Sequence, residues 1–415
     1  MTAPPTPAST TTASAAATTM PTARVPAAAV DRAQRLAGTA VAVPGSGIRE
    51  IVMLAYGRTD VVHLEIGEPD FATPAHVVAA GDAALATANR YTPSAGVPAL
   101  RRAIAERLHT RYGLTDDPER VIVSQGAVQG LAAVLAVLVE PGDEVLVPDP
   151  AWPNYEMQTL LLGGRPVRYP LRPERGFRPD PDEVAALITP RTRVLVLNTP
   201  SNPTGAVLEP GLVRALVETA VAHGVTVVAD EVYDEIVFDG SHANAAAMAP
   251  DDVVSVFSFS KTYAMTGSRV GYLTAPAWLA PTLARVQEPL LSSISAASQA
   301  SAIAALDGPQ DVVGEMVETY RRRRDLVVDR LAAAGLPVEP PAGAFYLMLP
   351  LAEGADSRTA ALDLVGHGVA LAPGTAFGST ARSHLRLSLA SSAEDLTAGL
   401  DRFATWYAAT SGGLR

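Results

Sequence analysis

The chain has 415 residues, 48% of them hydrophobic, which is enough to bury a large core in two domains or in one large domain with an added lobe. A formal net charge of −11 without a long basic run argues against a nucleic-acid-binding protein, because such proteins need clustered cations. The absence of cysteine excludes disulfides, thiolate metal sites and a cysteine nucleophile, and the seven histidines are scattered singly, so we expect no metal site.

Residues 1–40 form a segment rich in Ala, Thr, Pro and Ser that shows no apolar periodicity. A segment of this composition cannot bury enough surface to fold, so we expect a disordered tail, which translation from Met20 would shorten. The tail lacks the apolar core of a signal peptide, and the longest apolar run of the chain, Gly130 to Val139, is too short to span a membrane. The sequence therefore predicts a cytoplasmic protein without membrane contact.

From Val121 onward, short apolar or β-branched runs alternate with segments of helical periodicity. Helices are expected at Gly130 to Val139 and at Leu212 to His223. Strands are expected at Val121 to Ser124, Glu144 to Pro148, Val194 to Asn198, Val225 to Asp230 and Val253 to Ser258. This alternation predicts an α/β fold with an open, mostly parallel sheet that is covered by helices on both faces.

Polar clusters follow four of these strands, at the point where each strand ends. They are Ser124 to Val128, Asn198 to Gly205, Asp230 to Tyr233 and Ser258 to Lys261. Ligands of α/β proteins bind at the carboxyl ends of parallel strands, so the sequence predicts one crevice and one ligand there.

The pattern changes beyond about Gly308, where a long arginine-rich helix is expected. Its densest basic run, Arg321 to Arg324, is interpreted as a solvated helix face. Strands are expected further on, at Phe345 to Leu349 and at Leu385 to Leu389. This region predicts a separate α+β lobe.

Lys261 is the one lysine among the 32 lysine and arginine residues. Arginine can bind anions, but it does not lose its proton near neutral pH, whereas a lysine of lowered pKa can become an amine nucleophile and form a Schiff base. Codon bias that removed lysines and left one by chance is the alternative. Ser258 and Arg269 flank Lys261 with a hydroxyl and a fixed cation, which suits a phosphate dianion held near the amine.

Three further groups point to the same crevice. Asp230 ends an apolar strand, where a carboxylate is costly to bury without a cation, although a helix cap would also account for it. The backbone amides of Gly126, Ala127 and Val128 start a helix and would point at an anion. Arg386 occupies an inward-facing position of an alternating strand and needs a carboxylate, from a ligand or from an internal salt bridge.

The run from Ser258 to Gly271 resembles the pyridoxal-phosphate lysine segment of class I and II aminotransferases, the aspartate aminotransferase superfamily of fold type I. The likeness extends from about Ser46 to Ala390. The other segments that carry it are Gly67 to Phe71, Tyr91 to Gly96, Ser124 to Gln129, Pro150 to Tyr155, Asn198 to Gly205, Pro373 to Gly378 and His384 to Leu389.

This resemblance implies a large domain with a mostly parallel, seven-stranded type of sheet between helices and a smaller α+β domain. The large domain would comprise residues 76–308. The small domain would combine an N-terminal segment, residues 41–75, with residues 309–415.

The resemblance also implies roles for individual residues. Lys261 would hold pyridoxal 5′-phosphate as a Schiff base and move the substrate proton, and Asp230 would keep the ring nitrogen protonated. Tyr233 and Asn202 would contact the ring hydroxyl, with a cis bond possible between Asn202 and Pro203. Trp152 would stack on the ring.

The phosphate and the substrate would be bound by further residues. Gly126, Ala127, Val128, Ser258 and Arg269 would hold the phosphate. Gly67, Trp152, Asn202 and Arg386 would contact the substrate, with Arg386 on its α-carboxylate. Tyr91 would reach the phosphate of a neighbouring subunit, which implies a homodimer with shared sites.

The implied reaction is a ping-pong transfer of an amino group from an L-amino acid to a 2-oxo acid. A β-lyase or an aminocyclopropane-carboxylate-synthase-like enzyme on the same scaffold is the main alternative. A ligand-sensing domain and a cofactor-free aldolase are weaker alternatives. The substrate side chain stays open between acidic and neutral, with Arg49 and Arg285 as candidate cations for a distal carboxylate.

Overall fold

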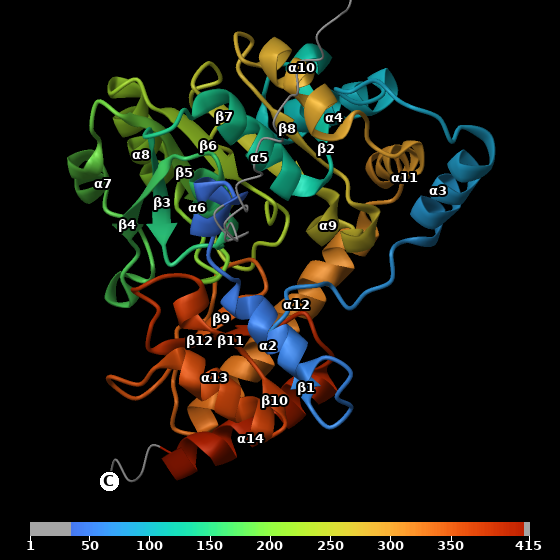
Figure 1. Ribbon diagram of the computed structural model, residues 1–415. Helices are drawn as coiled ribbons and strands as arrows, with labels where there is room; N and C mark the ends of the chain where they lie inside the picture. Colours follow the sequence, from blue (N-terminus) through green and yellow to red (C-terminus); the bar gives the residue numbers. More distant parts are fainter. Residues whose placement is uncertain (1–34, 411–415) are drawn as a thin grey trace, which may run out of the picture. The chain divides into compact units, whose positions relative to one another are not determined.

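A seven-stranded sheet with the order β2-β8-β7-β6-β5-β3-β4 lies among helices in the computed structural model (Figure 1). Its strands are β2 (Val121–Ser124), β3 (Glu144–Asp149), β4 (Arg165–Pro170), β5 (Thr192–Asn198), β6 (Thr226–Asp230), β7 (Val253–Ser258) and β8 (Gly271–Thr274). The strands from β7 to β4 pair in parallel, and β8 is antiparallel to both of its neighbours. The predicted mostly parallel α/β sheet is confirmed.

The structure describes residues 35–410. Most of the predicted tail, residues 1–34, lies outside the described residues, and the helix α1 occupies Gly38–Ala42. Within residues 35–410, every helix is too short or too polar to cross a lipid bilayer.

Helices cover both faces of the sheet because successive residues of each strand point to opposite sides. Along β5, Val194 and Val196 belong to one apolar cluster, while Leu195 and Leu197 belong to another. The helices of this part of the chain are α3 (Ala75–Thr87), α4 (Pro98–Tyr112), α5 (Gly126–Leu138), α6 (Asn154–Leu161), α7 (Pro181–Leu187), α8 (Pro210–Ala222), α9 (Phe259–Thr262), α10 (Ala280–Leu291) and α11 (Ala296–Asp307).

Two of the seven strands were not predicted. β4 is an edge strand that contains two prolines and two arginines, residues typical of sheet edges and untypical of central strands. β8 begins with glycine and ends with threonine, so only Tyr272 and Leu273 are apolar and give too weak a signal.

Among residues 35–410, the remaining strands form two small sheets, accompanied by four helices. A three-stranded antiparallel sheet has the order β11-β12-β9, and β1 pairs in parallel with β10. The elements are α2 (Gly47–Ala55), β1 (Val62–His63), α12 (Asp311–Ala333), β9 (Tyr346–Pro350), α13 (Ser357–Gly366), β10 (Val369–Ala370), β11 (Ala372–Pro373), β12 (His384–Ser388) and α14 (Ala393–Thr410). The N-terminal elements α2 and β1 pack against α13 and α14 (Figure 1).

The interpretation of Arg321 to Arg324 as a solvated helix face was wrong for half of the run. Arg323 and Arg324 are 9% and 8% exposed, because α12 turns them toward the protein. Arg324 donates to Asp239, and Arg323 pairs with Asp70. Arg322 remains on the solvated side, with a side chain 64% exposed.

Candidate active site

Lys261 lies on the short helix α9, directly after β7. The Ser258 hydroxyl caps this helix by accepting from the amide of Ser260 at 3.1 Å, which fixes the turn that carries the lysine. Lys261 Nζ donates to the carbonyl oxygen of Gly67 at 2.6 Å. The pKa of Lys261 is lowered to about 8, mainly by desolvation; Glu68 opposes this shift, and nearby Arg386 and Arg269 contribute to it. The amine is therefore much easier to deprotonate than that of an ordinary lysine.

The lowered pKa of Lys261 gives a testable result. An acylating reagent attacks the neutral amine, so the labelling rate of Lys261 in cofactor-free protein should rise through a midpoint near pH 8. Because Lys261 is the one lysine of the chain, mass spectrometry of its peptide reports this single side chain. Protein unfolded in urea is the control, with a midpoint near the ordinary value of 10.5. A midpoint near 10.5 in the folded protein would contradict the expectation.

Asp230 stands at the carboxyl end of β6. Its Oδ2 accepts from the phenol of Tyr155 at 2.6 Å, and its backbone carbonyl accepts from Asn198 Nδ2 at 3.0 Å. Burial raises the pKa of Asp230 to about 6, and the hydrogen bond from Tyr155 opposes that rise. Among residues 35–410, no lysine, arginine or histidine forms an ion pair with this carboxylate, so it can accept a cationic ligand.

Arg386 lies on β12 and is 2% exposed. Its guanidinium lies over the rings of Tyr346 and Phe377, at 4.3 and 4.7 Å from the ring centres. Nη1 donates to Asn202 Oδ1 at 2.9 Å and Nη2 to the carbonyl of Glu65 at 2.5 Å. Nε is buried without a partner among the described residues. A buried cation with a free donor of this kind is suited to a carboxylate.

The Asn198–Gly205 turn connects the Asp230 and Arg386 regions. The backbone N–H of Asn202 donates to Asn198 Oδ1 at 2.8 Å, and Asn198 Nδ2 in turn donates to the backbone carbonyl of Asp230. The Asn202–Pro203 peptide bond is cis, as the resemblance suggested.

A positively charged cradle lies at the start of α5. Gly126 has a φ of +72°, a conformation that favours glycine, and a Cβ there would lie 2.4 Å from Arg269 Nη2. Arg269 Nη1 is anchored by the carbonyl of Thr266 at 2.9 Å. Ala127 and Val128 occupy the first turn of this thirteen-residue helix, whose amides favour an anion.

One cavity of about 620 Å³ brings most of the predicted residues together. It is lined by Gly67, Ala127, Val128, Trp152, Asn202, Asp230, Tyr233, Ser258, Lys261, Arg269 and Arg386. Gly126 packs against the guanidinium of Arg269, which lines the cavity. Tyr91 is 93% exposed and lies outside the cavity wall of its own chain. Of the two candidate cations, Arg49 lines the cavity, whereas Arg285 bonds to Thr282 outside it.

Sequence reasoning missed two aromatic side chains of the cavity wall. Tyr155 bonds to Asp230, and Tyr346 contacts the phenol of Tyr233 at 3.0 Å. Both residues fall in segments that were recognised, in the Pro150 to Tyr155 run and in a predicted strand. The inward direction of Tyr346 depends on the register of β9 with β12, which places Tyr346 opposite Ser388 and Met348 opposite Arg386, whereas Tyr155 lies in the first turn of α6.

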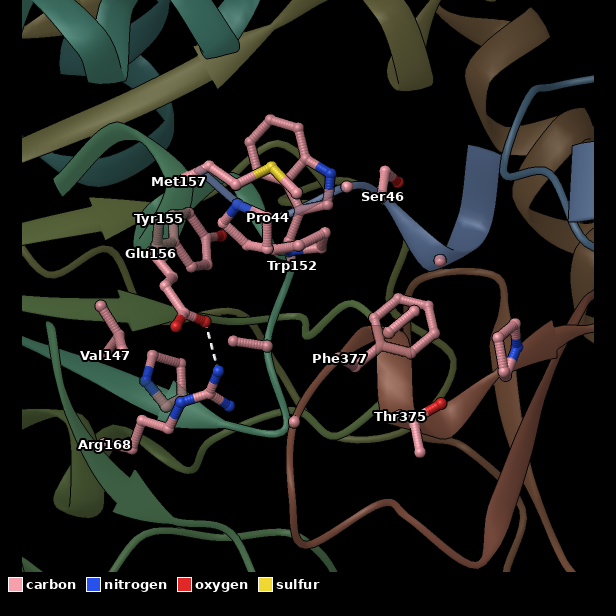
Figure 2. A pocket seen from close by; sticks show the side chains of 18 of the residues that line it. Pro44, Ser46, Val147, Trp152, Tyr155, Glu156, Met157, Arg168, Thr375 and Phe377 are labelled. Carbon is pink, nitrogen blue, oxygen red and sulfur yellow. Dashed lines mark hydrogen bonds and ion pairs between the residues drawn. The ribbon is translucent and has the colours of Figure 1, made fainter. Parts of the chain in front are cut away.

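A second cavity of about 510 Å³ adjoins the first and shares Trp152 and Tyr155 with it. Figure 2 shows the Glu156–Arg168 ion pair at one wall of this second cavity and Thr375 with Phe377 at the facing wall. Phe377 also packs on the guanidinium of Arg386. Trp152 therefore borders both cavities, and the loop around Phe377 connects them.

The fold thus places a lysine amine, a buried carboxylate and the guanidinium groups of Arg269 and Arg386 around one cavity at the carboxyl ends of the parallel strands. The chain belongs to the family of class I and II aminotransferases, whose model matches residues 59–403. It is thus an enzyme that transfers amino groups, and the resemblance stated from the sequence is confirmed.

Known proteins of this family are similar over most of the chain. The aspartate/prephenate aminotransferase of Thermus thermophilus is 41% identical over 352 residues, which cover 83% of this chain and 90% of that protein. The arginine–pyruvate transaminase of Pseudomonas aeruginosa is 40% identical over 380 residues, covering 90% and 96%. The solved structure of Thermus thermophilus aspartate aminotransferase with maleate has a TM-score of 0.85 at 38% identity and covers 89% of this chain and 99% of that chain.

Proposed function

We propose that this aminotransferase binds pyridoxal 5′-phosphate in the 620 Å³ cavity and moves an amino group from an L-amino acid to a 2-oxo acid by a ping-pong reaction. One observation carries the proposal. The single lysine of the chain, with its pKa lowered to about 8, lines the same cavity as the buried carboxylate of Asp230 and the guanidinium groups of Arg269 and Arg386.

The residues present fit this cofactor. A dianionic phosphate suits the cradle of Arg269 and the first amides of α5, where Gly126 leaves room that any side chain would fill. A protonated ring nitrogen suits the buried Asp230, which has no ion-pair partner among residues 35–410. The ring itself suits the space beside Trp152.

Pyridoxal phosphate, when bound, supplies an aldehyde that condenses with amines and a ring that withdraws electrons from the carbon next to the nitrogen. Lys261 Nζ then holds and moves the proton of that carbon, a task that its lowered pKa favours. Asp230 keeps a negative charge beside the ring nitrogen, and Tyr155 holds the carboxylate in place through its 2.6 Å hydrogen bond. Tyr233 and Asn202, which line the same cavity, would hold the ring hydroxyl.

Arg386 binds the α-carboxylate of the substrate. Two aromatic rings and two oxygen acceptors fix its guanidinium before substrate arrives, so little freedom is lost on binding. Gly67 and Trp152 line the same cavity and would contact the substrate. Arg49, Ile48 and Val52 also line the cavity and are the residues that would contact the substrate side chain.

We also propose that two copies of the chain share their sites and that the enzyme acts in the cytoplasm. Tyr91 supports the first point, because an aromatic side chain that is 93% exposed and outside its own cavity is available to a neighbouring copy.

The absorbance spectrum of the purified protein tests the proposal. Pyridoxal phosphate bound to a lysine is yellow, and single amino acids added without an oxo acid should bleach this colour, which a 2-oxo acid should restore. The panel should include acidic, basic and apolar amino acids, because the relatives named above act on aspartate and prephenate or on arginine. Release of pyruvate with the yellow colour retained would favour a β-lyase, and a colourless protein that takes up no added cofactor would contradict the cofactor assignment.

A further inference from the structure

The Glu65–Thr73 segment forms one side of the proposed active site and is held by several side chains. Its Glu65 carbonyl accepts from Arg386, and its Gly67 carbonyl accepts from Lys261 at 2.6 Å. Thr266 donates to Glu68, and Thr73 donates to the carbonyl of Ala264 at 2.6 Å. The backbone of this segment is thus in contact with both cations on which the proposed chemistry depends.

The backbone of this segment can move little without a clash or the loss of a hydrogen bond. A Cβ on Gly67 would lie 1.7 Å from the phenol oxygen of Tyr346, so the backbone already touches that side chain. A shift toward Tyr346 would collide, and a shift away would break the contact with Lys261.

The segment is also tied to a helix that takes no part in the cavity wall. Arg323 on α12 forms a two-pronged ion pair with Asp70, with Nη1 to Oδ1 at 2.8 Å and Nη2 to Oδ2 at 2.6 Å. Its guanidinium also lies over the rings of Phe71 and Tyr320, at 5.3 and 5.8 Å from the ring centres. The side chain is 10% exposed, so the pair is largely shielded from water.

We propose that Arg323 is a positioning residue for amino transfer, and that its fork to Asp70 sets where the Glu65–Thr73 segment presents its carbonyls to Lys261 and Arg386. The inference rests on the proposed function, because it assumes that these two cations act on substrate. Arg322, the preceding residue of α12, is 64% exposed and pairs with Glu318 of its own helix, which makes it a matched control.

The test compares Arg323→Met and Asp70→Asn with Arg322→Met. For the first two variants, KM for the amino acid donor should rise at least about tenfold, because displacements near 1 Å in a positioned site cost that much or more, and kcat should change less. Arg323→Lys, which keeps the charge but loses the fork, should restore part of the loss. Arg322→Met should keep the KM of the wild-type enzyme within about twofold.

A second readout does not depend on activity. Release of the segment lets water reach Lys261, and since desolvation is the main cause of its lowered pKa, the labelling midpoint of cofactor-free Arg323→Met and Asp70→Asn should move upward from about 8. Arg322→Met should leave the midpoint in place.

Each outcome is decisive. Unchanged KM and unchanged labelling midpoint in folded Arg323→Met and Asp70→Asn would overturn the positioning role. If Arg323→Met does not fold, the Asp70→Asn variant alone tests the positioning role. The Asp70 side chain is 31% exposed, so its replacement should destabilise the fold less than the loss of the buried Arg323. If the wild-type protein transfers no amino group, the proposed function fails, and the labelling midpoints still decide whether Arg323 positions the segment.

Discussion

Replacement of Lys261 by alanine is expected to lower the rate of amino transfer at least about 10³-fold, because a positioned proton-transfer group contributes about 10² to 10⁴ and no other lysine exists to replace it. Nearby Arg386 and Arg269 stay protonated and cannot take over the proton. The loss should appear in kcat, measured by the formation of product 2-oxo acid.

Two further variants serve as comparison for that result. Lys261→Arg keeps the charge, but a guanidinium does not lose its proton near neutral pH and cannot act as a base or an amine nucleophile, so this variant should be as inactive as the alanine variant. Arg285→Ala removes an arginine that bonds to Thr282 outside the cavity, and it should keep the wild-type rate within about twofold. Near-wild-type turnover by Lys261→Ala would rule out the proposed role of the lysine.

Replacement of Arg386 by methionine should lower kcat/KM for an amino acid by about 10² to 10³, since the loss of one partner of a buried charge pair costs about 2 to 5 kcal/mol. The reason is specific to this site. The guanidinium is 2% exposed, and its Nε has no partner among the described residues, so a substrate carboxylate would be its main anionic partner.

The choice of substrate separates this role from general damage. A primary amine without a carboxylate cannot use Arg386, so its slow reaction with the cofactor should change little in Arg386→Met. The selectivity for amino acid over amine should therefore collapse. Equal losses for both substrates would mean that Arg386 supports the structure and does not bind the carboxylate.

Much of the large sheet could be predicted because its central strands are buried on both faces. Such strands appear in the sequence as short apolar runs, and β2 and β7 were found with their observed ends. β4 and β8 were missed because neither carries that signal. One is an edge strand with prolines and arginines, and the other begins with glycine and has only two apolar residues, Tyr272 and Leu273.

The residues of the candidate site were predictable where chemistry demands one side-chain type. Lys261, Asp230 and Arg386 stand at strand ends or in a strand, and each would be costly to bury without a ligand. Tyr155, Tyr346 and Arg323 were not assigned, because their roles follow from partners far away in the sequence. Nothing near Arg323 indicates that Asp70 lies opposite it, so a run of four arginines resembled an exposed helix face.

The strand order has a consequence for the way this chain is completed during synthesis. β2 is the first strand of the large sheet to leave the ribosome, but its neighbour in the sheet is β8. Its backbone groups therefore have no strand partner until Thr274 has been made, long after β3 to β7 can pair among themselves. Such non-local pairing slows folding and leaves an apolar edge open in the meantime. The nascent chain should thus depend on chaperones most while the segment between β2 and β8 is being translated.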